Sequence, residues 1–300
     1  MLRQVTTPEL WKMYKTHQNS YWSAEEIDLH LDNFEKLPQG VRKWMTLVLS
    51  WFANADVLVM ANIPNFMNDL SDSIEGQAFL GFQQMIEMIH TETYHLLLET
   101  YLPEEERVAA YASIREVPTI RAKKLWLESY SNANFQDRLI VWAACELIMF
   151  SASFATIFYC KAHHSGSIPG CFQANEFIAR DEGLHCKFGC ALAKIHGVSE
   201  RAHQIIREAC NIERAFVTDA MSEYIVGITS KDMCDYVNYC GDILCGLLEI
   251  PKIYNTPLPT SLNFMETINM KSQANFFERK VTAYTTKPLE KSEWGLDDNF

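Results

Sequence analysis

The stretch that decides the fold is Phe82-Gln-Gln-Met-Ile-Glu-Met-Ile-His-Thr-Glu-Thr-Tyr94, where a glutamate precedes a histidine by three residues. Its apolar residues recur at helical spacing, which predicts a helix from about Asp72 to Tyr101, ended by Leu102-Pro103. Residues i and i+3 share a helix face, so Glu87 and His90 can direct a carboxylate and an imidazole to one point. The stretch is therefore a candidate half of a metal site.

The same spacing occurs a second time, in Glu182-Gly-Leu-His185. This pair lies in another predicted long helix, from about Phe172 to His196. One Glu-x-x-His match in a chain of 300 residues is expected by chance. Two matches, each in the middle of an apolar helix, indicate a shared function.

Two further acids stand on the other two long apolar segments. Asp56 lies in WFANADVLVMANI (51–63), and Glu146 lies in LIVWAACELIMFSASFATIFY (139–159). A lone acid on an apolar helix is usually a hydrogen-bonded core residue or an active-site acid. However, ionised carboxylates are almost never buried without a compensating charge. Two divalent or trivalent cations would stabilise four acids and two histidines together.

This arrangement is the one found in ferritin-like dimetal carboxylate bundles, in which two helices give one acid each and two give Glu-x-x-His. Carboxylate-rich ligation with two imidazoles suits iron or manganese better than zinc or copper. We therefore predict an all-α, ferritin-like bundle. The predicted metal ligands are Asp56, Glu87, His90, Glu146, Glu182 and His185.

The segment 139–159 is also long enough to span a bilayer and carries one charge, Glu146. A carboxylate at mid-span is costly in lipid. A helix buried on all sides in a large protein fits the same pattern. We find no second such segment, so we expect a buried helix from about 135 to 162 and no membrane association.

Helix signals continue along most of the chain, without convincing strand signals. We expect a helix from Val41 to Ile63 that is stopped by Pro64, because proline cannot donate the helical hydrogen bond. Shorter helices are predicted at about 104–116, 119–131, 200–226 and 230–248. Residues 1–251 should form one helical domain. Beyond Pro251 the pattern decays, so 252–300 should be an irregular tail.

Composition excludes several classes of function. The net charge of −12 argues against nucleic-acid binding, which needs a basic surface. The nine cysteines include no C-x-x-C pair and lie in apolar stretches, as free thiols do in a reducing compartment. The segment Met1–Val5 begins no apolar signal sequence. We therefore expect a cytoplasmic protein, in the host cytoplasm if it is viral.

Tyr94 lies four residues after His90, and therefore on the same helix face. Taken alone it would be a core tyrosine with a hydrogen-bonded hydroxyl. Phe150 and Phe154 follow Glu146 at four-residue intervals, and Ile178 precedes Glu182 by one turn. Around a tyrosine beside an oxygen-activating metal pair, such residues would exclude water and reductants.

Four motifs resemble a known family in this order along the chain. They are EMIHTETYHLLLETYL (87–102), CELIMFSASFATIFY (145–159), FIARDEGLHCKFGC (177–190) and NFFERKVTAY (275–284). Together they resemble the small subunit of class I ribonucleotide reductases, in its eukaryotic and viral form. The resemblance implies that the six ligands bind two iron ions and that Tyr94 carries a tyrosyl radical. It also implies a homodimer that works with a large subunit to reduce ribonucleoside diphosphates to deoxyribonucleotides.

The resemblance also assigns roles that spacing does not. Trp22 would pass an electron towards the metals through Asp181, which would be hydrogen-bonded to His90. The residues themselves predict only a packing role for Trp22, at the start of a helix. Arg180 would belong to the same network, and Tyr284 would be a relay tyrosine. The terminal WGLDDNF would dock on the large subunit through three apolar side chains, Trp294, Leu296 and Phe300.

Three alternatives stay open at this point. An iron-storage ferroxidase of the same fold would need neither Tyr94 nor a docking tail. Another dimetal oxidase, such as a manganese–iron oxidase that binds its own ligand, would need a substrate tunnel and no aromatic route from Trp22. A paralogue without catalytic function could lack metals, but here the ligand set is complete.

Overall fold

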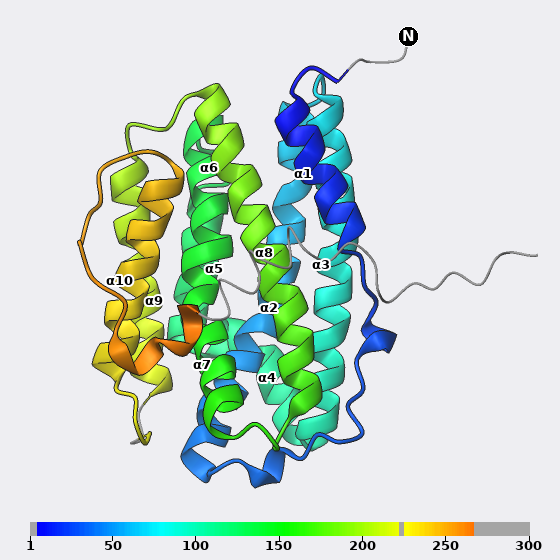
Figure 1. Ribbon diagram of the computed structural model, residues 1–300, viewed down its shortest axis with the longest axis vertical. Coiled ribbons are helices and arrows are strands. Elements are labelled where there is room, and N and C mark those ends of the chain that lie inside the picture. Colours follow the sequence, from blue (N-terminus) through cyan, green and yellow to red (C-terminus); the bar gives the residue numbers. More distant parts are fainter. Residues whose placement is uncertain (1–4, 222–224, 267–300) are drawn as a thin grey trace, which may run out of the picture.

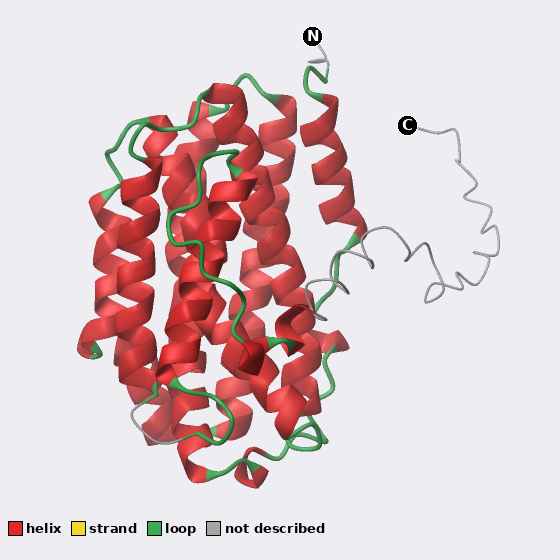
Figure 2. Ribbon diagram, turned by 60° about the vertical axis from the view of Figure 1, so that its left-hand side comes forward, coloured by secondary structure: helices red, strands yellow, loops and turns green. Residues whose placement is uncertain are grey.

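Four long helical rods bring the acids and histidines together. The computed structural model describes residues 5–221 and 225–266. The rods are α2 (Gln39–Asp69), α3 (Ile74–Tyr101), α8 (Pro169–His196) and a composite rod of α6 (Phe135–Ala144), the π-helical turn η3 (Cys145–Met149) and α7 (Phe150–His163). Helix α2 packs along α3, and α6 and α7 pack along α8. The described residues contain helices and loops but no β-strand (Figure 2), which confirms the all-α prediction.

The remaining helices cover this four-rod core (Figure 1). Helix α1 (Pro8–Asn19) lies against α3 and α8, whereas α9 (Ala202–Ala220) and α10 (Ser230–Leu247) pair with each other on the opposite side. Helices α4 (Glu104–Glu116) and α5 (Pro118–Ser129) pack against α2. Helix α5 also packs against α9. Most helices begin and end within a few residues of the predicted bounds.

Two helical segments, not one, are long and apolar enough to cross a membrane. They are Gln39–Asp69 and Phe135–His163, and the most apolar windows within them are 61% and 94% buried inside the protein. The sequence-based expectation of a single such segment was therefore wrong. The burial of both segments accounts for their apolar character, because they are core helices of the bundle.

Helix α2 does not stop at Pro64, as predicted, but continues to Asp69. Proline leaves the carbonyl of Met60 without its helical donor and usually breaks a helix. Here the residues on either side of the proline, Ile63 and Phe66, are buried. The Phe66 ring also contacts the indole of Trp142 on α6, with ring centroids 4.9 Å apart. This packing holds the last turns in helical form.

The predicted continuous helix at 135–162 is interrupted at the position of Glu146. One π-helical turn, Cys145–Met149, separates α6 from α7. Such turns contain one extra residue and occur often at functional sites. The carbonyl of Met149, at the end of the turn, accepts hydrogen bonds from Lys123 Nζ (3.0 Å) and Trp51 Nε1 (3.1 Å). Lys123 is itself fully buried and paired with Glu213 at 2.5 Å, so the turn is firmly anchored.

The start of α8 is fixed by the loop that precedes α2. Both carboxylate oxygens of Asp32 accept backbone N–H groups, from Gly170 (2.7 Å) and Cys171 (3.0 Å). A Cβ atom on Gly170 would lie 2.5 Å from the carbonyl oxygen of Asp28, so only glycine permits this approach. The contact sets the position of α8 along the bundle axis.

The chain beyond α10 stays attached to the bundle as far as it is described. The carboxylate of Asp242 accepts the backbone N–H groups of Ile253, Tyr254 and Thr256. Leu262 is fully buried. The predicted boundary at 251 and the nature of the tail stay predictions, because residues 267–300 lie outside the described residues.

All nine cysteines lie in the described part of the chain, and all are free thiols. Eight are buried, and Cys234 is partly exposed. The sequence-based interpretation of the cysteines as buried thiols, with no disulfide framework, is therefore confirmed.

Candidate metal centre

The six predicted ligands meet in the centre of the four-rod core. Helix α2 contributes Asp56, α3 contributes Glu87 and His90, the π-helical turn contributes Glu146, and α8 contributes Glu182 and His185. None is more than 3% exposed. Their ligand atoms form two groups, within each of which all the atoms lie less than 4.8 Å apart. One group joins Asp56 and His90, the other joins Glu146 and His185, and both contain Glu87 and Glu182.

The two shared glutamates lie between the two histidines. Glu87 approaches His185 Nδ1 with one oxygen (3.1 Å) and His90 Nδ1 with the other (3.4 Å). Glu182 does the same, at 2.8 Å from His185 Nδ1 and 3.0 Å from His90 Nδ1. Each carboxylate can therefore bridge two cations, while each histidine presents Nδ1 to one of them.

Several of these buried atoms have no hydrogen-bond partner, which is the observation expected of a site built for cations. Buried polar atoms are almost always paired in folded proteins. Asp56 Oδ1 and Oδ2 and Glu146 Oε2 have no such partner. Glu182 Oε1 and Glu87 Oε2 lie 3.0 and 3.4 Å from His90 Nδ1 but form no hydrogen bond with it. Two divalent cations would balance four carboxylates and complete the bonding of these atoms, so the residues fit a dimetal site.

The electrostatics of the cluster agree with this fit. Burial raises the pKa of the Asp56 carboxyl well above its usual value, and the neighbouring charge of Glu87 adds to the shift. Burial likewise raises the pKa of Glu146, with Glu182 and Glu87 contributing. Both acids are therefore costly to ionise without a cation. Cation binding would supply the missing positive charge.

Two side chains hold the ligands from behind. Trp142 Nε1 donates to Glu146 Oε1 (2.8 Å). Gln83 Nε2 donates to the same oxygen (3.1 Å) and to Glu87 Oε1 (3.0 Å). These bonds leave Glu146 Oε2 free to face a metal. Outer partners of this kind orient metal ligands.

Trp22 and Asp181 form a chain of contacts with His90. Trp22 Nε1 donates to Asp181 Oδ2 (2.8 Å), and the same oxygen lies 3.5 Å from His90 Nε2. The indole also stacks on the His90 ring, with centroids 5.9 Å apart. Arg180 donates from Nε to Asp181 Oδ1 (3.0 Å) and lowers the pKa of that carboxyl to about 2 despite its burial.

Tyr94 is fully buried in an apolar shell next to the centre. Its ring stacks on Phe52 at 4.6 Å, and Phe52 in turn contacts Phe150 and Phe154. The hydroxyl donates to Asn175 Oδ1 (2.8 Å). Burial raises the pKa of the phenol well above its usual value, with a further contribution from the charge of Asp56.

Sequence reasoning missed five side chains of the site. Helical spacing could have found four of them, because Phe52, Gln83 and Trp142 each precede an acid ligand by four residues and Asn175 precedes Glu182 by seven. The fifth, His17, gives no such signal. Its imidazole reaches His185 from α1, and only the three-dimensional structure reveals this contact.

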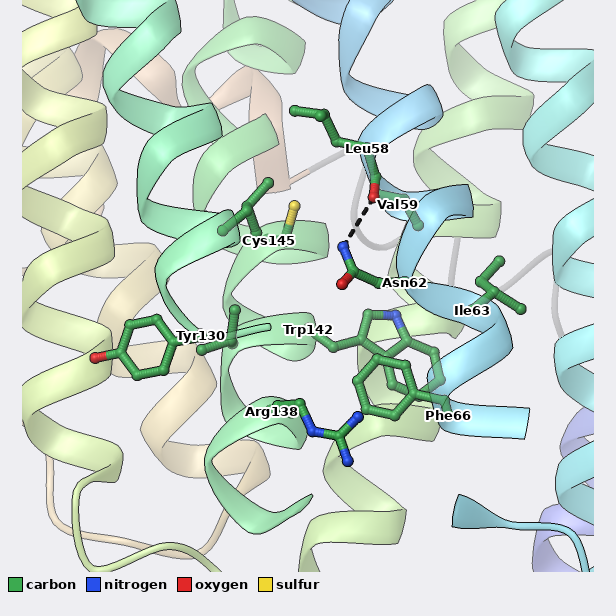
Figure 3. A pocket seen from close by; sticks show the side chains of 11 residues that line it. Leu58, Val59, Asn62, Ile63, Phe66, Tyr130, Arg138, Trp142 and Cys145 are labelled. Carbon is green, nitrogen blue, oxygen red and sulfur yellow. Dashed lines mark hydrogen bonds between the residues drawn. The ribbon is translucent and has the colours of Figure 1, made fainter. Parts of the chain in front are cut away.

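A narrow, mainly apolar pocket lies between α2, α5 and α6 (Figure 3). Its walls include Ile63, Phe66, Tyr130, Arg138 and Trp142, and none of the six predicted ligands lines it. Trp142 borders the pocket and donates to Glu146. Trp142 therefore contacts both the pocket and the metal centre.

The predicted residues of the tail cannot be placed relative to the centre. Tyr284, Trp294, Leu296 and Phe300 all lie outside the described residues. Their assignments stay predictions.

An all-α bundle with two Glu-x-x-His helices and two single acids around a site for two cations defines a ferritin-like dimetal carboxylate protein. Residues 1–261 match the family described as ribonucleotide reductase, small chain. The protein therefore belongs to the ribonucleotide reductase small chain family. Members of this family generate a radical and act with a large subunit as ribonucleoside-diphosphate reductase.

Individual relatives agree with this assignment. The protein is 36% identical to the ribonucleoside-diphosphate reductase small chain of Nicotiana tabacum, in an alignment that covers 99% of this sequence and 94% of that one. It is 35% identical to the small chain of vaccinia virus, over 97% of this sequence and 94% of the relative. The structure of the Rnr4 homodimer of Saccharomyces cerevisiae matches with a TM-score of 0.77 and 25% identity, over 90% and 89% of the two chains.

We predict that Glu87→Ala or Glu182→Ala lowers metal content sharply. Each change removes a bridging anion and leaves cationic charge uncompensated in a buried site. Metal analysis of the purified proteins measures the effect. Glu92→Ala, an exposed acid on the same helix as Glu87, is the control and should bind as much metal as the wild type. Two tightly bound ions per chain in both test variants would contradict the ligand assignment.

Proposed function

We propose that the six ligands hold two iron ions and that Tyr94 is the residue oxidised to a tyrosyl radical. The observation that carries this proposal is the pair of bridging glutamates between two inward-facing histidine Nδ1 atoms, with unpaired carboxylate oxygens around them. A carboxylate-rich donor set of this kind suits iron. Tyr94 lies on the same helix as two of the ligands and is fully buried.

When bound, two iron ions and dioxygen supply the oxidising power for removing one electron from a phenol. The protein prepares the phenol for that reaction. The raised pKa keeps Tyr94 protonated, so its oxidation releases a proton together with the electron. Asn175 holds the hydroxyl in one direction through its amide oxygen. The stacked ring of Phe52 shields the phenol from water and reductants.

A chain of buried contacts that leads to His90 supports an electron route to the centre. Trp22 is 2% exposed and is joined to His90 through the carboxylate of Asp181. We assign these residues the transfer of single electrons between the surface and the metal centre. Arg180 also donates to the carbonyl of Ser20 (2.6 Å), close to Trp22, and so holds the route together. Tyr284 would extend it towards the large subunit.

The large subunit would bind the end of the chain. Residues 294–300, Trp-Gly-Leu-Asp-Asp-Asn-Phe, carry three large apolar side chains among acids. Aromatic anchors on a short segment commonly fill pockets on a partner. In this assembly the oxidising equivalent of Tyr94 passes to a cysteine of the large subunit, where ribonucleoside diphosphates are reduced. The small subunit would not bind the nucleotide.

A second copy of the chain is the partner we assign to an apolar face on α2 and α3. Met85, Met88 and Leu96 follow one face of α3 and are exposed, as is Val57 on the adjacent helix α2. Apolar side chains gathered on two packed helices are typical of protein interfaces. The yeast structural relative is described as a homodimer, which supports a second copy as the partner.

The alternatives fit these observations less well. An iron-storage ferroxidase leaves the Trp22–Asp181–His90 chain and the Asn175-bound phenol without a role. An independent oxidase needs its substrate beside the metals, whereas none of the six candidate ligands lines the pocket of Figure 3.

We predict that Tyr94→Phe keeps the fold and both metals but abolishes the tyrosyl radical, because only the oxidisable hydroxyl is lost. Electron paramagnetic resonance after addition of ferrous iron and oxygen measures the signal. Tyr101→Phe, which removes a second buried tyrosine hydroxyl from α3, is the control and should retain it. A radical signal that survives Tyr94→Phe would place the radical on another residue.

Deletion of residues 294–300 should leave the metals and the radical intact but abolish ribonucleotide reduction with the large subunit. A free peptide of these seven residues should compete weakly, because it loses the effective concentration that the tether provides. The same peptide with alanine at its three apolar positions should not compete. Full reductase activity from the truncated protein would contradict the docking role.

We predict that Met88→Asp converts the dimer to a monomer, since it places a charge at the most exposed apolar position of the α2–α3 face. Light scattering after size-exclusion chromatography gives the mass. Val108→Asp, at a similarly exposed apolar position on α4, is the control and should remain dimeric. A dimeric Met88→Asp variant would assign the interface elsewhere.

A further inference from the structure

A third histidine reaches the metal centre from outside the four-rod core. His17 lies on α1 and is fully buried. Its Nε2 lies 3.2 Å from Nε2 of His185, within hydrogen-bond distance. The two rings meet nearly edge to face, with centroids 4.8 Å apart. His17 is not one of the six ligands, because its contact is with the outward nitrogen of His185.

The surroundings of His17 are apolar. Its ring contacts Phe79 and Phe82 of α3, at centroid distances of 5.1 and 4.7 Å. Its other nitrogen, Nδ1, is buried and has no hydrogen-bond partner. The contact with His185 is therefore the only hydrogen bond found for this imidazole among the described residues. The polar interaction available to this buried ring is therefore the hydrogen bond with His185.

The bonding of His185 decides which nitrogen carries each proton. Its Nδ1 faces Glu87 and Glu182, where a cation would bind, so a neutral, ligating His185 carries its proton on Nε2. That N–H then donates to Nε2 of His17, which must be unprotonated. The remaining proton of His17 lies on its unpartnered Nδ1. The pair has one consistent assignment of protons, and in it His17 is a neutral acceptor.

The other ligating histidine has a different outer partner. His90 Nε2 faces the carboxylate of Asp181, at 3.5 Å. An anionic partner makes an imidazole more basic and a stronger ligand than a neutral partner does. The two metal positions therefore differ in two ways. One contains Asp56 and the other Glu146, and their histidines also have different outer hydrogen-bond partners. One histidine has an anionic outer partner, and the other has a neutral one.

We propose that His17 is a positioning residue that orients His185 and fixes its tautomer, and thereby sets the metal affinity of the His185 position separately from that of the His90 position. The inference rests on the proposed metal centre. His17 acts as a hydrogen-bond acceptor and does not itself touch the metal. Removing the acceptor leaves the Nε2–H of His185 buried and unpaired, and releases the ring from its orientation.

The test is a titration of the metal-free protein with manganous ion alone, in which the free ion is counted by its electron paramagnetic resonance signal. His17→Leu fills the space of the imidazole with an apolar side chain of similar size and removes the hydrogen-bond acceptor. His17→Gln supplies a neutral amide oxygen in its place. Gln18→Leu, an exposed change one residue further on α1, is the control for the helix, and thermal melting verifies that each variant is folded.

We expect His17→Leu to weaken one of the two binding steps about 10- to 100-fold, the range typical of lost outer partners, and to leave the other step unchanged. His17→Gln should restore most of the loss. The reciprocal variant Asp181→Asn should weaken the step that His17→Leu leaves unchanged.

The results test the role of His17 separately from the existence of the metal centre. Unchanged binding by His17→Leu, equal weakening of both steps, or failure of His17→Gln to restore affinity would overturn the role of His17 and leave the metal centre standing. If the wild-type protein does not bind manganous ion at two sites, the proposed metal centre itself is overturned.

Discussion

The structure depends on the burial of four carboxylates in one cluster that contains only two imidazoles to offset their negative charge. Ionised acids in a protein interior are strongly destabilising unless cations and hydrogen bonds compensate. In this fold the acids lie on four separate helical rods, and their carboxylates meet at one point. Gln83 and Trp142 donate to Glu146 Oε1, whereas Glu146 Oε2 and both oxygens of Asp56 have no hydrogen-bond partner. The helices are thus arranged around a charge that the protein alone cannot neutralise.

Two helices integrate the parts of this centre. Helix α8 carries two ligands and also Asp181, which connects to Trp22, and Asn175, which binds the Tyr94 hydroxyl. Helix α3 carries Tyr94 itself beside two more ligands. The residues proposed for electron transfer and for the radical are therefore positioned by the same two helices that carry the candidate ligands. Displacement of either helix would alter ligation, electron transfer and the radical together.

The sequence predicted what is local. Glu-x-x-His pairs and apolar periodicity depend on neighbours within a few turns, so the sequence predicted the helical class and most helix bounds, and it selected six side chains that the structure brings together. Three features were not predictable in this way. Helix α2 passes Pro64 because Phe66 packs on another helix, and the π-helical turn is held by Lys123 from α5. The contact of His17 joins residues far apart in the chain. Each depends on tertiary packing.

The approach of α1 from outside the core has a consequence for how such a protein can diversify. Its residue at position 17 touches an outer nitrogen of one ligand and two phenylalanine rings, but supplies no part of the four-rod bundle. If His17 acts as proposed, a single substitution there would change the surroundings of one metal position without changing any of the six ligand residues. Evolution could then adjust the two halves of the centre independently, through a helix that lies outside the four rods.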